Sequence, residues 1–344
     1  MRRYCWLCVA LLCSIAIVMQ AQNDVFRVKV DVPIVTLEAV VKDSSNRPLI
    51  HLSQADFEIY EDGQPQEIRY FEAGEAARSI LLVFDVTGVM ENSATFMQRA
   101  VSAVFANTRD QDKVAVGAMG PEFEMLMSFR KIDKSKLPSV KLPPTRIGSN
   151  LYESLGMAAR RFAKEDTRRA IVALTDGRDT HMFSETQRLG YPATIENDAD
   201  FKNRLEDARK RAVPYYFIAI DTDPRYIGNY DYEYAFFKNP DGYMRTAQFA
   251  NSKRSPTIAV DYLEAVKLRM ERLAEATGGR VTYIKSIPEV VDAFDRLSRE
   301  LGYSYSMGYA PKASLDDGKA HKIEIRTRAG YKVEQSRTTY GGLK

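Results

Sequence analysis

The sequence predicts a doubly wound α/β domain with a mostly parallel sheet, together with a small all-β, sandwich-like domain. Within residues 78–300, continuous apolar runs alternate with helical patterns, as expected for parallel strands that are covered on both faces. Residues 26–74 and 301–344 instead alternate apolar and polar residues over short stretches, which is typical of antiparallel strands. We expect these two flanking segments to pack together into the all-β part.

Residues 1–21 are interpreted as a secretory signal peptide. Arg2 and Arg3 precede an apolar stretch, and Ala21 offers a small residue for cleavage. The stretch is short for a membrane-spanning helix of about 20 residues, and an uncleaved anchor is the alternative. All three cysteines lie in this segment, at Cys5, Cys8 and Cys13. We therefore expect a thiol-free mature protein outside the cytoplasm, either periplasmic or secreted.

The charge balance excludes one class of partner. The 344 residues include 49 Lys and Arg against 46 Asp and Glu, so the chain is nearly neutral. Nucleic-acid binding requires a basic footprint, which this composition lacks. Beyond the first 21 residues, no apolar segment is long enough to suggest a membrane span.

The expected elements follow in chain order. The runs "FRVKVDVPIVTLEAVVKD" and "DFEIYEDGQPQEIRYF" are predicted strands, and Asp62-Gly63 is a hairpin signal because a tight primed turn needs positive φ. The α/β part begins with the strand "SILLVFD" and a helix over about residues 93–107. Later strands are expected at "KVAVGAM", "RRAIVALTD", "VPYYFIAID" and "RVTYI", and helices at "NLYESLGMAARRFA", "DADFKNRLEDARKRA", "VDYLEAVKLRMERLAEATGG" and "IPEVVDAFDRLSRELG". After Gly302 the alternating pattern of strands returns.

Oxygen-bearing side chains gather where the predicted strands end. Asp85 and Thr87 follow the first strand of the α/β part, Ser149 precedes a helix, and Asp176 follows the strand "RRAIVALT". Ligands of open parallel sheets bind outside the carboxyl ends of the strands. Carboxylate and hydroxyl oxygens without nitrogen or sulfur suit a hard cation, Mg²⁺ first and Mn²⁺ or Ca²⁺ as alternatives.

These motifs resemble a known family. The order D-x-T-G, G-S-x-L-Y and L-T-D-G is similar to the von Willebrand factor type A domain with its metal-ion-dependent adhesion site, and the flanking strands resemble a bacterial family related to it that is common in Acidobacteria. The resemblance implies a Rossmann-like domain in a non-enzymatic binding protein. It also implies that Asp85, Thr87, Ser149 and Asp176 hold a divalent ion, which leaves one coordination position for a carboxylate of a protein partner.

The sequence departs from the family pattern at one position. The family's first loop is D-x-S-x-S, and Val89 stands where the second serine would supply an oxygen. Either water replaces that ligand or the ion is lost. In the second case the domain would be a metal-free structural or assembly module that uses the Tyr-rich segment 222–260. The tyrosines of that segment that we expect to form a contact surface are Tyr226, Tyr230, Tyr232, Tyr234 and Tyr243.

An enzyme remains the second alternative. "FDVTGV" also matches the nucleophile loop of haloacid dehalogenase-type phosphoesterases, in which Asp85 would attack phosphorus while Asp176 and Asp179 hold Mg²⁺. Thr87 argues against it, because the leaving group needs a second acid at that position. His51, His181 and His321 have no metal-ligand spacing, and surface or hydrogen-bonding roles are expected for them.

Overall fold

The structure is a computed structural model. It describes residues 34–74, 76–87, 90, 94–165, 167–221, 255–286, 288–312 and 317–341, without the side chains of residues 183, 187 and 255–260. The predicted signal peptide at residues 1–21 therefore lies outside the described residues. Among the helices that the structure describes, none is long and apolar enough to cross a membrane.

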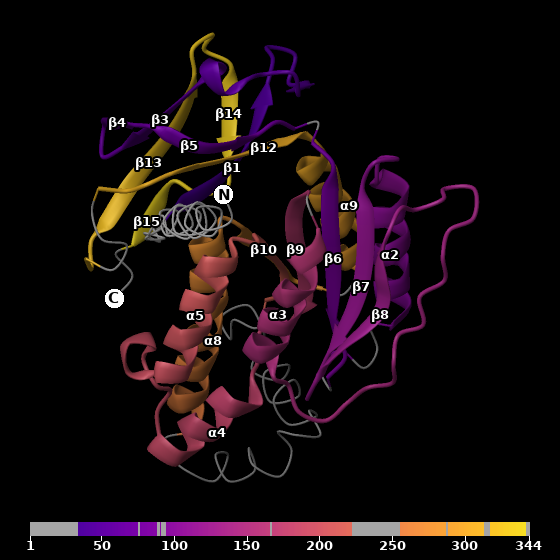
Figure 1. Ribbon diagram of the computed structural model, residues 1–344. Coiled ribbons are helices and arrows are strands. Elements are labelled where there is room, and N and C mark those ends of the chain that lie inside the picture. The colour runs from indigo at the N-terminus through magenta and orange to yellow at the C-terminus, as the bar shows by residue number, and fades with distance from the viewer. Residues whose placement is uncertain are drawn as a thin grey trace, which may run out of the picture. The chain divides into compact units, whose positions relative to one another are not determined.

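A six-stranded sheet forms the centre of the α/β part (Figure 1). Its order is β11-β10-β9-β6-β7-β8, and every pairing is parallel except that of β7 with the edge strand β8. The strands are β6 (Arg78–Asp85), β7 (Lys113–Met119), β8 (Phe123–Arg130), β9 (Arg168–Thr175), β10 (Tyr215–Ile220) and β11 (Arg280–Ile284). The predicted doubly wound, mostly parallel sheet is confirmed.

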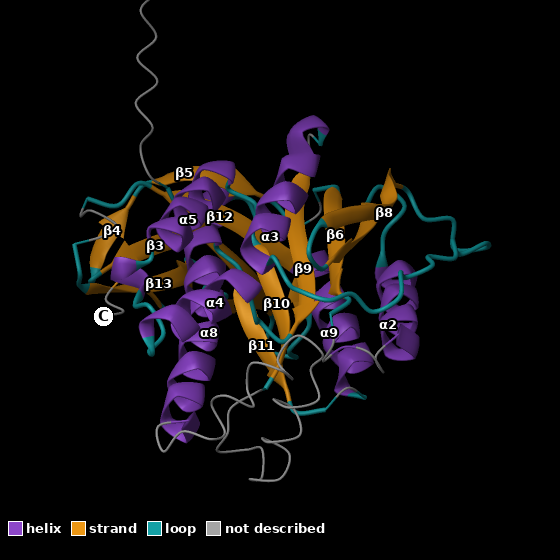
Figure 2. Ribbon diagram, turned by 90° about the horizontal axis from the view of Figure 1, so that it is seen from below, coloured by secondary structure: helices purple, strands orange, loops and turns teal. Residues whose placement is uncertain are grey.

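Helices cover both faces of this sheet (Figure 2). The helices are α2 (Ala94–Asn107), α3 (Leu151–Arg160), α4 (Thr180–Leu189), α5 (Ala199–Arg211), α8 (Ser255–Thr277) and α9 (Glu289–Tyr303). Short 3-10 helices lie at Gln54–Asp56, Arg161–Lys164 and Ile195–Asn197. Side chains of β6 alternate between two cores: Leu81 and Val83 pack with residues of α3, α5 and α8, whereas Leu82 and Phe84 pack with α2 and α9. This two-sided burial explains why β6 is a continuous apolar run.

Two features of the helices differ from the sequence-based expectation. Helix α4 was not predicted, because its sequence "THMFSETQRL" has few apolar residues. The carboxylate of Asp179 caps the start of this helix, and Gly190, at φ +77°, ends it. Helix α8 begins at Ser255, so the expected connection 222–260 was too long at its end. Residues 222–254, with their tyrosines, lie outside the described part of the chain.

Strands from both ends of the described chain form two antiparallel sheets. One has the order β14-β1-β12-β5 with β2 beside β1, and the other the order β15-β13-β3-β4. Their bounds are β1 (Val35–Lys42), β2 (Pro48–Leu49), β3 (Phe57–Glu61), β4 (Gln64–Gln66), β5 (Ile68–Glu72), β12 (Ser304–Tyr309), β13 (Ala320–Thr327), β14 (Lys332–Gln335) and β15 (Thr339–Gly341). Leu37, Ile59, Met307 and Ile323 from both sheets share one core. The predicted all-β part is confirmed, while the exact domain boundaries stay a prediction.

The hairpin between β3 and β4 follows its sequence signal. Asp62 and Gly63 both have positive φ, +49° and +78°, as a tight primed turn requires. This turn also places Asp62 beside β13, because β3 pairs with β13 through Glu61 and Ile323.

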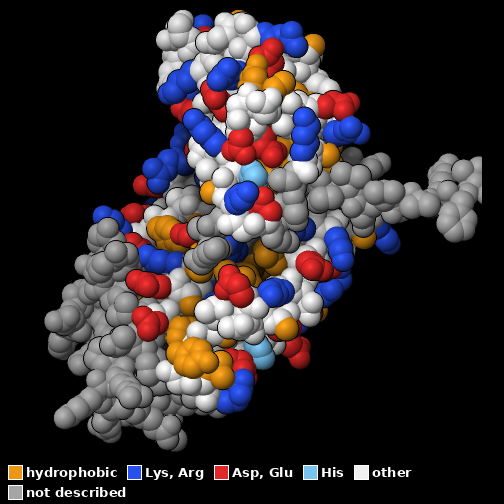
Figure 3. Space-filling model, turned by 90° about the vertical axis from the view of Figure 1, so that its left-hand side faces the viewer, with side chains coloured by type: hydrophobic (Ala, Val, Ile, Leu, Met, Phe, Trp, Pro, Cys, Tyr) orange, Lys and Arg blue, Asp and Glu red, His pale blue; other side chains and the backbone are white. Residues whose placement is uncertain are grey.

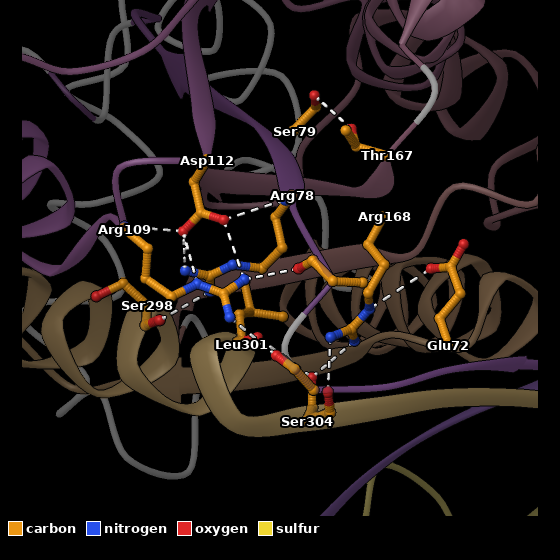
Figure 4. A network of polar contacts seen from close by, with 12 residues as sticks. Glu72, Arg78, Ser79, Arg109, Asp112, Thr167, Arg168, Ser298, Leu301 and Ser304 are labelled. Atoms are coloured by element: carbon orange, nitrogen blue, oxygen red, sulfur yellow. Dashed lines mark hydrogen bonds and ion pairs between the residues drawn. The ribbon is translucent and has the colours of Figure 1, made fainter. Parts of the chain in front are cut away.

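Buried ion pairs join the amino ends of the central strands to their surroundings (Figure 4). Arg78, the first residue of β6, donates to Asp112 Oδ2 at 2.5 Å, and Arg109 also bonds this carboxylate. Arg168, the first residue of β9, donates to Glu38 Oε2 of β1 and to the Ser304 carbonyl, both at 2.6 Å. The all-β part is thus tied to the α/β sheet through buried guanidinium groups.

Candidate functional site

Neighbouring strands bring the predicted site residues to one edge of the sheet. Phe84 of β6 lies opposite Leu174 of β9 in a parallel pair, so Asp85, one residue after Phe84, and Asp176, two residues after Leu174, both lie at the carboxyl end of the sheet. Asp85 has no exposed surface and Asp176 is 2% exposed. Two carboxylates are therefore buried side by side at the position where an α/β sheet binds ligands.

Hydroxyl groups hold the Asp85 carboxylate. Thr87 donates to Oδ1 from its hydroxyl at 2.6 Å and from its backbone N–H at 3.0 Å. Thr175 donates its hydroxyl to Oδ2 at 2.8 Å. No lysine or arginine pairs with Asp85 among the residues described, so neutral donors alone face this buried carboxylate.

The two carboxylates repel one another. Burial, followed by the negative charge of Asp176, raises the pKa of Asp85 to about 7, although the hydrogen bonds from Thr87 and Thr175 act in the opposite direction. The Arg178 backbone N–H donates to Asp176 Oδ1 at 3.0 Å, and the Arg178 Nε lies 3.4 Å from Oδ2. One guanidinium thus lies beside Asp176, while no cationic side chain of the described residues pairs with Asp85.

The Ser149 hydroxyl is buried and has no hydrogen-bond partner in the structure. Its backbone is nevertheless fixed: its N–H donates to Thr180 Oγ1 at 2.8 Å, and its carbonyl accepts from the Thr180 N–H at 2.7 Å. Gly148, at φ +85°, supplies the turn before it. Burying a hydroxyl without a partner costs about 1–3 kcal/mol, and a ligand at this edge of the sheet would offset that cost at Ser149.

Backbone contacts join the three loops that carry these residues. The Arg146 N–H donates to the Val86 carbonyl at 2.8 Å, and Thr87 pairs with Arg146 as an isolated bridge. The Ser149–Thr180 contacts then connect this segment to the loop after β9. The structure therefore brings the loops of Asp85 and Thr87, of Ser149, and of Asp176 together. Val89 lies outside the described residues.

Sequence reasoning missed two residues of this site. Thr175 was read only as the end of an apolar strand, yet its hydroxyl donates to Asp85 and accepts from the Gly177 N–H at 2.9 Å. A polar residue directly before the aspartate of "LTDG" was the available signal. Arg178 was also overlooked, because its contact with Asp176 depends on the sharp turn at Gly177, where φ is +80°.

Asp179 has a different role from the one that the phosphoesterase hypothesis requires. Its Oδ1 accepts from the His181 N–H at 2.8 Å and from the Met182 N–H at 3.5 Å, as a helix cap does. Burial raises the pKa of Asp179 despite these bonds. The carboxylate is thus engaged in starting α4.

Comparison with known proteins gives one family match and several similar solved structures. Residues 80–178 match the family model described as von Willebrand factor type A domain. Similar solved structures include an aerotolerance-related membrane protein from Bacteroides fragilis, with 14% identity over 65% of this chain and 98% of that chain and a TM-score of 0.36. A von Willebrand factor type A structure from Catenulispora acidiphila shows 11% identity over 85% of this chain and 76% of that chain, with a TM-score of 0.44.

A third similar structure is proximal thread matrix protein 1 from the mussel byssus. It has 13% identity over 70% of this chain and 49% of that chain, with a TM-score of 0.41, and its structure contains a zinc-occupied MIDAS motif, the metal-ion-dependent adhesion site. No curated protein sequence matches the chain. The family match over residues 80–178 covers strands β6 to β9 of the doubly wound sheet, and this part of the chain is similar to a von Willebrand factor type A domain.

Proposed function

We propose that the protein binds a protein partner through a divalent cation held at the carboxyl end of the sheet. The cation ligands in this proposal are Asp85, Thr87, Ser149 and Asp176. The von Willebrand factor type A domain is a protein-interaction module, which supports the general role. The observation that carries the metal is the buried Ser149 hydroxyl without a partner, in a site that also buries two carboxylates.

The residues present fit a hard cation. Every proposed ligand atom is a carboxylate or hydroxyl oxygen, which favours Mg²⁺ or Mn²⁺ over ions that prefer nitrogen or sulfur. A bound divalent ion would offset the repulsion between Asp85 and Asp176 and would give the Ser149 hydroxyl a partner. When bound, it would also offer an open position to an anionic oxygen of the partner. Thr175 acts beside the ligands by fixing the orientation of the Asp85 carboxylate.

The surface charge supports a protein partner over a nucleic acid. On the face drawn in Figure 3, Lys and Arg side chains are interspersed with Asp and Glu side chains and form no single-sign patch. The Tyr-rich segment follows β10, which ends at Ile220 on the same edge of the sheet as β6 and β9. The tyrosines of this segment lie outside the described residues, and their contact surface stays a prediction. An extracytoplasmic location belongs to the proposal as well, and it rests on residues 1–21 alone.

The phosphoesterase alternative has weaker support. Its second metal ligand, Asp179, caps helix α4, and the Thr87 hydroxyl donates to Asp85 where an acid would be needed. We therefore propose that the protein is not an enzyme. Turnover of a generic phosphate ester by the wild type that is lost in Asp85→Asn would overturn this choice.

Calorimetric titration with Mg²⁺ and Mn²⁺ tests the proposal. We expect saturable binding of one ion by the wild type at pH 8 and none by Asp85→Asn, whose amide cannot supply the charge. Asp133→Asn is the matched control, because Asp133 is exposed and remote in sequence from the site, and it should bind like the wild type. Absence of saturable heat in the wild type would favour the metal-free assembly module.

A further inference from the structure

A second group of metal-ligating side chains lies in the all-β part, away from the carboxyl ends of the α/β strands. Glu61 ends β3, Asp62 forms the following turn, and His321 lies on the neighbouring strand β13. One potential ligand atom of each lies within 4.8 Å of those of the other two. His321 follows Asp62 by 259 positions in the chain, and the three residues meet only because β3 pairs with β13.

The imidazole of His321 is held in a fixed orientation. Its Nδ1 lies 2.7 Å from Asp62 Oδ2 and 3.9 Å from Glu61 Oε1, while its Nε2 lies 3.1 Å from Asp317 Oδ2. The ring of Tyr340 stacks on it with centroids 4.9 Å apart. An imidazole that gives its other nitrogen to a carboxylate is the usual arrangement of a metal-bound histidine.

The carboxylates around this ring are also positioned from outside. The Tyr340 hydroxyl donates to Glu61 Oε1 at 3.0 Å, and the Lys322 backbone N–H donates to Asp62 Oδ1 at 2.8 Å. These contacts hold Asp62 Oδ2 and Glu61 Oε1 at 2.7 Å and 3.9 Å from the Nδ1 of His321. The ligand atoms of Glu61 on β3, Asp62 in the turn and His321 on β13 therefore lie close together.

The charge of the group is not balanced by the residues described. Glu61 is 6% exposed, and the side-chain donors beside its carboxylate are the neutral hydroxyl groups of Tyr340 and Tyr309. In the described ranges, no lysine or arginine forms an ion pair with Glu61, Asp62 or Asp317, so one imidazole faces three carboxylates. A buried carboxylate without full compensation is costly, and a divalent cation would supply the missing charge.

We propose that Glu61, Asp62 and His321 form a site for a zinc-type divalent ion, with Asp317 orienting the histidine from the far side. One imidazole nitrogen and two carboxylates suit Zn²⁺, whereas Mg²⁺ and Ca²⁺ prefer oxygen alone. Three protein ligands leave a fourth position for water. Asp62 has 51% of its side chain exposed, which gives the ion a path of entry. The ion would fasten the β3–β4 turn to β13.

The test uses the full chain with the three cysteines of residues 5–13 replaced by serine and with Asp85→Asn, so that neither thiols nor the first site bind the ion. Equilibrium dialysis against Zn²⁺ should then show one ion per chain, and Co²⁺ should give the visible absorption of a low-coordinate site. His321→Gln should weaken Zn²⁺ binding more than tenfold, and Asp317→Asn about tenfold. His51→Gln, at an exposed histidine, is the matched control and should bind like its parent.

The outcomes separate this site from the one at Asp85. Zn²⁺ binding that disappears with Asp85→Asn alone would assign the ion to the first site and overturn the inference. Equal binding by the His321→Gln and His51→Gln chains would overturn it too. Circular dichroism checks that each variant is folded, and if His321→Gln is not, the comparison of Asp317→Asn with its parent decides. No Zn²⁺ bound by the parent chain would mean that a protonated imidazole alone joins the two aspartates.

Discussion

Buried carboxylates at the two ends of the strands β6 and β9 have pKa values shifted in opposite directions. At the amino ends, Arg78 begins β6 and pairs with Asp112, whose carboxylate has no exposed surface. At the carboxyl end of β6, Asp85 also has no exposed surface, but the donors that the described residues supply to it are hydroxyl and amide groups. Although burial acts to raise both, the bonds from Arg78 and Arg109 lower the pKa of Asp112 to about 2, whereas that of Asp85 rises to about 7.

This contrast shows how strongly the partners act on the state of a carboxylate, because neither side chain has exposed surface. Glu38 gives the intermediate case: burial raises its pKa in spite of the positive charge of Arg168. Asp112 differs from Glu38 because two arginines and two backbone N–H groups bond it. The amino end is therefore a completed ion-pair network, whereas the carboxyl end holds two buried carboxylates whose repulsion the proposed cation would offset.

The largest effect is expected from breaking the completed network. Asp112→Asn should lower the free energy of unfolding by about 3–5 kcal/mol, because it leaves two guanidinium groups without their shared carboxylate. Urea unfolding at pH 7 measures this. Asp110→Asn, at an exposed neighbour, should change stability by less than about 0.5 kcal/mol. A loss of the same small size for Asp112→Asn would mean that the network contributes little.

At the carboxyl end of β6, removing the carboxylate is expected to raise the free energy of unfolding. In the presence of a chelator, Asp85→Asn should raise the free energy of unfolding at pH 8 by about 2 kcal/mol, because the wild type must bury an ionised carboxylate. The folded pKa of about 7 lies above the unfolded value of 3.8, so the wild-type contribution of Asp85 is full below pH 3.8 and is lost as the pH rises through 7. The gain should therefore shrink at pH 5. A gain that does not depend on pH would contradict ionisation of Asp85 as its cause.

The hydroxyl group of Thr175 is expected to increase the affinity of the site for Mg²⁺. Thr175→Val keeps the shape but removes the hydroxyl that orients Asp85, and we expect about tenfold weaker Mg²⁺ binding, equivalent to about 1.4 kcal/mol. Thr175→Ser should restore most of the affinity because it returns the donor. Equal affinities for both variants would show that the hydroxyl has no positioning role.

Replacing Ser149 is expected to have the smallest effect on stability but to weaken metal binding. Ser149→Ala removes a hydroxyl that has no partner, so the metal-free protein should change by less than about 1 kcal/mol, while Mg²⁺ affinity should fall several-fold. Ser154→Ala is a close control, because Ser154 is also buried with an unpartnered hydroxyl but lies within α3. Calorimetry on both variants should separate them, and the same Mg²⁺ affinity in both would remove Ser149 from the ligand set.

Much of the fold could be predicted from the sequence, because a strand that is buried on both faces is a continuous apolar run. The run "SILLVFD" could be read as a covered strand, and its two cores confirm it. Helix α4 was missed because it depends on its cap at Asp179 and not on an apolar stripe. Asp85, Thr87, Ser149 and Asp176 could be named from their motifs, and their loops do meet, while their binding of an ion stays a proposal.

Contacts between distant segments could not be predicted in the same way. His321 shows no metal-ligand spacing in the sequence, since Asp62 lies 259 positions before it. The expected hydrogen-bonding role of His321 is confirmed, but its partners follow from the pairing of β3 with β13. Likewise, Arg78 and Asp112 are 34 positions apart, and only the folded sheet shows that one compensates the other.

The effect of Mg²⁺ on unfolding tests most directly the proposal that the carboxyl end of the sheet binds a cation. At pH 8, a Mg²⁺ concentration about 100-fold above the dissociation constant should stabilise the wild type by about 2.7 kcal/mol relative to chelator. Asp85→Asn should be as stable with chelator as with Mg²⁺. Equal stabilisation of both proteins by Mg²⁺, or of neither, would contradict a cation site at Asp85.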